Sequence, residues 1–183
     1  MIRGEKVVLR ALEATDTERC HAWINDPEVT QFLHMRYPVS LLAEGKWVQQ
    51  ERDPLRELEL AVETTAGVHI GNCALRGAGS VDRAAELGIV IGDKAHWGQG
   101  YGADTVLTLC GFGFNEMNLH RIFLHVYQFN PRAIACYVKC GFQHEGRLRE
   151  AFFRKGAYHD ILVMGILEDE FRAKWPERCA PAQ

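Results

Sequence analysis

The chain has 183 residues, 47% of them hydrophobic and 25% charged, which is an ordinary composition for one globular domain with a sizeable core. The net charge of −3 and the lack of a basic cluster do not favour nucleic-acid binding. No apolar stretch is long enough to span a membrane, and residues 1–6 lack the apolar region of a signal peptide. We therefore expect a cytoplasmic protein with neither nucleic acid nor a membrane as partner.

Hydrophobic periodicity and capping residues divide the chain into strands and helices. Asp16 and Ser40 offer N-cap side chains, and Asn130-Pro131 adds proline at the first helical position. The pattern predicts, in chain order, a strand over 6–12, a helix over 16–25, a short helix and a loop within 28–42, a helix over 40–50, strands over 58–63, 68–75 and 86–91, a helix over 103–114, a strand over 119–129, a helix over 130–140, and strands over 143–153 and 158–167.

This order of elements predicts a single α/β (α+β) domain over residues 1–175. Its centre is expected to be a mixed, mostly antiparallel twisted sheet flanked by helices. The stretch 86–91 is almost continuously apolar, which indicates a central strand. Residues 176–183 are polar and contain two prolines, and we expect them to form a loosely held tail.

A glycine-rich turn, Trp97-Gly-Gln-Gly-Tyr-Gly102, joins the central strand to the helix that follows it. Glycine lets the backbone approach a ligand closely, and the free N–H groups at a helix N-terminus attract phosphate. The turn lacks the Gly-Lys-Ser/Thr ending of a Walker A loop and the Gly-x-Gly-x-x-Gly spacing of a dinucleotide fingerprint. The glycines alone leave open both a phosphate cradle and a tight loop without a ligand.

The six cysteines contain no Cys-x-x-Cys pair, so in a cytoplasmic chain we expect reduced thiols. Cys136, Cys140 and His144 have spacings that could be drawn as a metal site or as a thiol nucleophile with its base. Gly141-Phe142 ends the helix before His144, however, and we expect no metal. Tyr137 lies on the same helix beside Ile134, so helical spacing alone predicts a half-buried core tyrosine.

Taken together, these segments resemble the GNAT superfamily of acetyl-coenzyme A-dependent N-acetyltransferases. The resemblance covers about residues 2–171 and is nearest to the branch of the ribosomal-protein N-terminal acetyltransferases. It rests on Trp97-Gly-Gln-Gly-Tyr-Gly102, Leu119-His-Arg121, Asn130-Pro-Arg-Ala133 through Tyr137 to Gly141-Phe142, and Glu145-Gly-Arg-Leu-Arg149 followed by Gly156. The family usually begins its phosphate loop with Arg or Gln, where this chain has Trp97.

The resemblance implies that acetyl-CoA is the co-substrate and that backbone amides of the turn cradle its pyrophosphate, namely those of Gln99, Gly100, Tyr101, Gly102 and Ala103. The central strand would pair with the pantetheine arm through Ile89, Val90 and Ile91. A backbone N–H near Val90 would receive the developing oxyanion. Asn130 matches the family position that hydrogen-bonds the pantetheine region.

The implied reaction is direct attack of a primary amine on the thioester in a ternary complex. Tyr137 matches the family's acid, which protonates the leaving thiolate. Glu86, at the start of the central strand, is our candidate base, and its alternative is a solvated carboxylate at a strand end. Roughly a tenth of an α-amine is neutral at pH 7, whereas a lysine-like amine needs a base.

The acceptor is the least readable part of the sequence. Residues 31–37 are aromatic and mildly basic, and they lack the acidic side chains that would hold a polyamine. This favours a neutral or acidic acceptor such as a peptide N-terminus or an amino-sugar, unless these residues only pack the helices. A non-catalytic acyl-CoA-binding or sensing protein on the same fold is the alternative function. A homodimer is compatible with the resemblance.

Overall fold

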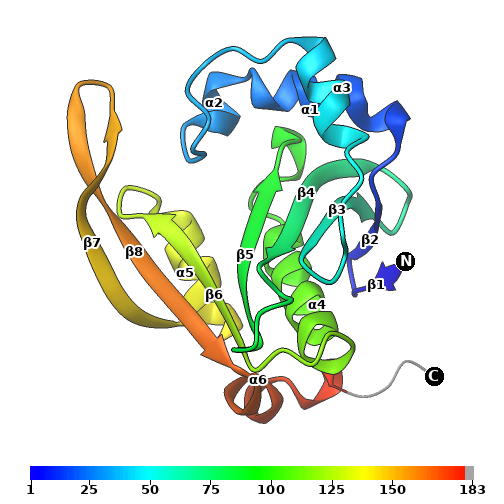
Figure 1. Cartoon of the computed structure of the whole chain (residues 1–183), viewed down its shortest axis with the longest axis vertical. Helices are drawn as coiled ribbons and strands as arrows, with labels where there is room; N and C mark the ends of the chain where they lie inside the picture. Colours follow the sequence, from blue (N-terminus) through cyan, green and yellow to red (C-terminus); the bar gives the residue numbers. More distant parts are fainter. Residues whose placement is uncertain (180–183) are drawn as a thin grey trace.

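The computed structural model describes residues 1–179, whose strands form one eight-stranded sheet (Figure 1). The strands lie in the order β1-β2-β3-β4-β5-β6-β8-β7. Every neighbouring pair is antiparallel except β5 and β6, which run parallel. The predicted fold class, a mixed and mostly antiparallel sheet flanked by helices, is therefore confirmed.

The predicted elements occur in the predicted order, and the structure adds a short strand at 2–3 and a helix at 168–174 that were not predicted. The strands are β1 (Ile2–Arg3), β2 (Val7–Ala11), β3 (Glu57–Thr64), β4 (His69–Arg76), β5 (Ala84–Ile91), β6 (Arg121–Tyr127), β7 (Gln143–Arg154) and β8 (Ala157–Leu167). The helices are α1 (Thr17–Ile24), α2 (Pro27–Thr30), α3 (Leu41–Val48), α4 (Tyr101–Asn115), α5 (Pro131–Cys140) and α6 (Glu168–Lys174), with 3-10 turns η1 (Ala14–Asp16), η2 (Lys94–His96) and η3 (Pro176–Arg178). None of the helices within residues 1–179 is both long and apolar enough to cross a membrane.

Capping residues fix where α3 and α5 begin and where α5 ends. The Ser40 hydroxyl accepts a hydrogen bond from the Ala43 N–H at 3.1 Å and starts α3. The Asn130 side chain accepts one from the Ala133 N–H at 3.2 Å and starts α5. Gly141 ends α5 with a φ of 110°, a left-handed conformation that glycine adopts without steric cost.

Helices cover the sheet unevenly. The long helices α4 and α5 lie behind it in Figure 1, while α1, α2 and α3 gather at its upper end. The contact of α1 with the sheet is close, because the Trp23 indole lies directly on Gly92, just beyond β5. A Cβ atom added at Gly92 would stand 2.1 Å from a ring carbon of Trp23. The absence of a side chain at residue 92 therefore sets how near α1 approaches the end of β5.

The two central strands separate after a short pairing. β5 and β6 pair only where Ala84–Glu86 lies beside Arg121–Phe123, and no later position of β5 is paired with β6. The remainder of β5 stays hydrogen-bonded to β4 on its other edge. One edge of β5 is consequently left open, and it faces the gap between the two halves of the sheet (Figure 1).

The end of the described chain is docked, which differs from the loosely held tail expected over residues 176–183. Residues Pro176–Arg178 form η3, and the Arg178 guanidinium pairs with the Asp104 carboxylate at 2.8 Å. Asp104 is buried in the first turn of α4, so this ion pair ties the chain's end to the helix that carries the glycine turn. The rest of the expected tail, residues 180–183, lies outside the described residues.

We predict that Gly92→Ala lowers the free energy of unfolding by about 1–3 kcal/mol, because the added methyl must displace the Trp23 ring. Urea denaturation measures this change. Gly146→Ala on β7 is the matched control, since a Cβ there has no heavy atom within 4 Å. Equal stability of the two variants would show that Trp23 is not held against Gly92.

Candidate active site

A cavity of 840 Å³ occupies the gap between β5 and β6. It is lined by both of these strands, the glycine turn, the N-terminal part of α4, α5, and the segment that follows α2. Most of the predicted site residues line it: Glu86, Ile89, Val90, Ile91, Gly100, Tyr101, Gly102, Ala103, Asn130 and Tyr137. Gln99 is not among the lining residues. Its side chain donates to the Ala95 carbonyl at 2.5 Å, and its own carbonyl accepts from Lys6 Nζ at 2.9 Å.

The glycine turn has the backbone that the sequence predicts. Gly98 and Gly100 have φ angles of 74° and 87°, in the left-handed region where other residues are strained. Gly100 is the N-cap of α4 and, as a glycine, offers no side chain to accept from the first helical N–H groups. The amides of Tyr101 to Ala103 thus begin a helix beside the cavity without a side-chain cap, which suits them to an anion.

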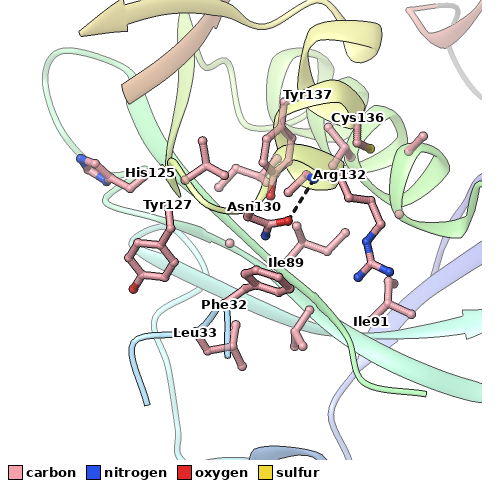
Figure 2. Close-up of a pocket in the computed structure, with 18 of the residues that line it drawn as sticks. Phe32, Leu33, Ile89, Ile91, His125, Tyr127, Asn130, Arg132, Cys136 and Tyr137 are labelled. Carbon is pink, nitrogen blue, oxygen red and sulfur yellow. Dashed lines mark hydrogen bonds between the residues drawn. The ribbon is translucent and has the colours of Figure 1, made fainter. Parts of the chain in front are cut away.

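Trp97, the departure from the family pattern, has a defined structural role. Its Nε1 donates to the Ile91 carbonyl at 2.6 Å, which fixes the turn against the end of β5. The Arg132 guanidinium lies over the Trp97 ring, 4.4 Å from its centre. Arg132 lines the cavity and has no ion-pair partner within residues 1–179 (Figure 2). The ring therefore positions a positive charge beside the glycine turn.

Backbone direction along β5 decides which amides face the cavity. N–H and C=O groups alternate between the two edges of a strand, and the Gly92 N–H donates to Ile70 of β4 at 2.9 Å. Val90, two residues earlier, consequently points its N–H to β4 as well. The backbone N–H and C=O groups of Ile89 and Ile91 therefore face the gap. The hydrogen bond from Trp97 to the Ile91 carbonyl agrees with this direction. Of the amides near Val90, one that faces the gap therefore belongs to a neighbour of opposite direction, such as Ile89.

Asn130 and Tyr137 meet the open strand edge from α5. The Asn130 oxygen caps the helix, which leaves its amide nitrogen for a ligand. Figure 2 shows the Tyr137 hydroxyl directed toward Asn130 and Ile89 at the centre of the cavity. No hydrogen bond engages that hydroxyl within residues 1–179, and burial raises the pKa of Tyr137 well above its usual range. The phenol therefore keeps its proton at neutral pH and is free to donate it.

Glu86 has a partner that the sequence alone did not reveal. His125 Nδ1 lies 2.7 Å from Glu86 Oε1, and both side chains line the cavity. Glu86 is on β5 and His125 is on β6, at the level where the two strands begin to separate. The pairing depends on the register of two strands that are distant in sequence. The alternating pattern of residues along 119–129 could indicate that the His125 side chain is exposed, but not that it contacts Glu86.

The cysteine alternatives gain no support from the geometry. Cys136 lines the cavity, whereas Cys140 is buried and its thiol donates to the Ala103 carbonyl at 3.8 Å. Contact with Cys136 and burial both raise the pKa of the Cys140 thiol. Within residues 1–179, no group of three or more His, Cys, Asp or Glu side chains is placed to hold a metal ion.

Comparison with known proteins agrees with this geometry. A family model described as Acetyltransferase (GNAT) domain matches residues 6–143. The spermidine N(1)-acetyltransferase of Vibrio cholerae is 30% identical over 168 residues, covering 92% of this chain and 96% of the relative. A putative ribosomal N-acetyltransferase of Bacillus subtilis is 25% identical over 181 residues, covering 93% of this chain and 96% of the relative.

A solved structure extends the comparison to three dimensions. The crystal structure of the V. cholerae spermidine N-acetyltransferase in complex with CoA and spermine superposes with a TM-score of 0.83 at 30% identity, covering 91% of this chain and 98% of that one. Relatives named for polyamines and for ribosomal substrates both match, so the comparisons do not single out the ribosomal-protein branch. The chain therefore belongs to the GNAT family and is an acetyl-CoA-dependent N-acetyltransferase.

Proposed function

We propose that the chain transfers the acetyl group of acetyl-CoA to the primary amine of a small-molecule acceptor, by direct attack in a ternary complex. The observation that carries this proposal is the convergence of Tyr137 and the Glu86–His125 pair on one cavity, along which β5 has an open edge. The relatives named for spermidine act on a small-molecule amine, which supports this acceptor class over a protein N-terminus.

The open edge of β5 orients the donor. The pantetheine arm contains two amides, which can pair with the edge of Ile89 and Ile91 as an added strand would. The pyrophosphate then meets the amides at the start of α4, where the helix dipole favours negative charge. Arg132 adds a full positive charge on the same side of the cavity. These contacts leave the thioester between Tyr137 and β5.

Proton transfer is divided between the two faces of the cavity. The Glu86–His125 pair receives the proton of the attacking amine, because a carboxylate that holds an imidazole can accept one through the ring or through water. The amine nitrogen bonds to the thioester carbonyl carbon, the carbon–sulfur bond breaks, and Tyr137 gives its proton to the departing thiolate. A backbone N–H of β5 that faces the cavity, such as that of Ile89, donates a hydrogen bond to the thioester carbonyl oxygen while that oxygen carries negative charge. The products are an N-acetyl amide and free CoA thiol.

We predict that Tyr137→Phe lowers kcat by about 10²–10⁴-fold while the Kd for acetyl-CoA changes little, because the ring stays and only the proton donor is lost. Thiol release from acetyl-CoA with a panel of amines measures kcat, and calorimetry measures binding. Unchanged turnover in this variant would refute the acid role. Binding of acetyl-CoA without thiol release for any amine, in the unmodified protein, would favour the non-catalytic alternative.

We predict that Glu86→Gln lowers kcat/KM strongly at pH 7 and less at pH 9, because more of the amine is already neutral near its own pKa. The pH–rate profiles of the variant and the unmodified enzyme measure this convergence. Glu51→Gln, a change at an exposed loop glutamate, is the matched control. A deficit that stays constant with pH would contradict a role in removing the amine's proton.

We predict that Arg132→Ala raises the KM for acetyl-CoA about tenfold or more and leaves kcat nearly unchanged, since a charge-assisted contact contributes about 1.5–3 kcal/mol. Arg132→Lys should recover part of the affinity because it keeps the charge. Steady-state kinetics with acetyl-CoA as the varied substrate measures both. A normal KM in Arg132→Ala would show that the guanidinium over Trp97 does not contact the donor.

A further inference from the structure

The cavity offers a polycation very little negative charge. Among its described lining residues, Glu86 supplies the one carboxylate, and His125 is already bonded to it. The lining also includes the positively charged side chains of Arg132 and Lys139, which have no ion-pair partner within residues 1–179. A third cation of the lining, Arg76, is paired with Glu57 and Glu59. The polyamine of the named relatives carries several positive charges and would need several carboxylates to hold it. The charges of this site favour a different acceptor.

Two further arginines stand at the acceptor end without a compensating carboxylate. Arg154, at the end of β7, donates to the carbonyls of Leu33 and Met35 at 3.0 and 3.4 Å and so holds the segment after α2 against the β7–β8 hairpin. Arg36 lies on that segment, and its guanidinium is 4.9 Å from the centre of the Phe152 ring. Within residues 1–179, neither arginine has an ion-pair partner, so both positive charges remain unneutralised.

An aromatic cluster connects these arginines to the cavity. The Phe152 ring stacks on Tyr127 with centres 4.0 Å apart, and Tyr127 lines the cavity. Burial raises the pKa of Tyr127, and the charges of Arg36 and Arg154 act against that rise. Both guanidinium groups are therefore within electrostatic reach of the Tyr127 hydroxyl. Phe129 also stacks with Tyr127, 5.4 Å between centres, and lies 6.2 Å from Phe152, so the three rings form one apolar wall.

The strand spacing sets a minimum length for the acceptor. His125 and Tyr127 are two residues apart on β6 and share its exposed face. Two residues of a strand span about 7 Å. The reacting amine belongs beside the Glu86–His125 pair, and the arginines belong beyond Tyr127. An acceptor that reached both would therefore separate its amine from its far group by at least about 7 Å.

We propose that the amine acceptor carries an anionic group, a carboxylate or a phosphate, which Arg36 and Arg154 bind at the Tyr127 end of the site. This inference rests on the proposed acetyl transfer. Guanidinium groups suit carboxylate and phosphate because their planar donors match two acceptor oxygens. The required length excludes a simple α-amino acid, whose amine and carboxylate share one carbon, and fits an ω-amino acid or an amino-sugar phosphate.

The donor's phosphates do not account for these arginines. In Figure 2, Arg132 and Ile91 lie on one side of the cavity, and His125 and Tyr127 lie on the other. The glycine turn and Arg132 mark the donor's phosphate end. A second group of positive charge at the opposite end calls for a second anion, and the acceptor is the other molecule that enters the cavity.

Matched pairs of amines test the proposal. 6-Aminohexanoate is compared with 6-aminohexanamide, and glucosamine 6-phosphate with glucosamine, and spermidine is the polycation. We expect the anionic member of at least one pair to have a kcat/KM tenfold or more above its neutral partner, and spermidine to be the poorest of the five. The pair with the larger ratio identifies carboxylate or phosphate. The proposal would be overturned if the anionic-to-neutral ratio of kcat/KM were near one in both pairs, or if spermidine were the preferred acceptor.

Variants assign the preference to the arginines. Arg36→Gln should bring the anionic-to-neutral ratio close to one, and Arg36→Lys should retain much of it. Arg3→Gln, the same change on the exposed outer strand β1, should leave the ratio as it was. A ratio insensitive to Arg36→Gln would overturn the assignment to this residue.

Calorimetric binding of each amine to the CoA-loaded protein separates the two proposals. Tighter binding of the anionic member without acetylation of any amine would refute the proposed acetyl transfer and support the charge preference. Acetylation of all five amines without a charge preference would support the proposed acetyl transfer and refute the charge preference.

Discussion

The site depends on the separation of β5 from β6 after only three paired positions. A strand in the middle of a sheet normally has both edges bonded, and an open edge must find another partner or water. Here β4 keeps one edge of β5 bonded, and the other edge faces a cavity of 840 Å³. An extended molecule that contains amides can complete that edge, and this is the surface that we propose for the donor.

Two helix N-termini converge on this gap, and each is fixed by contacts outside the cavity. The first turn of α4 is held through buried Asp104, which accepts from the Lys6 and Val7 amides at 2.7 and 3.0 Å and pairs with Arg178. The start of α5 is fixed by the Asn130 cap. Because both anchors are contacts within the protein itself, the fold holds the free amides of α4 and the Tyr137 hydroxyl in place.

The proposed donor end of the cavity, beside the glycine turn, and the proposed acceptor end, beyond Tyr127, are built from different kinds of groups. The donor end consists of backbone amides and a helix terminus, features that vary little when side chains change. The acceptor end is built from side chains on three separate segments, and here it presents Arg36 and Arg154 beside an aromatic wall. The same fold is therefore compatible both with relatives named for spermidine and with the anionic acceptor that we propose for this chain.

The sequence by itself determined the order of the elements, the caps at Ser40 and Asn130, and the glycine turn, because each depends on residues close together in the chain. The tertiary structure alone decided the Glu86–His125 pair, the direction of the Val90 amide, the Trp97–Arg132 stack and the approach of Arg36 to Phe152. It also showed that η3 is docked through Arg178, where composition indicated a loose tail. These features depend on strand register and on contacts between distant segments, which local patterns of hydrophobicity do not encode.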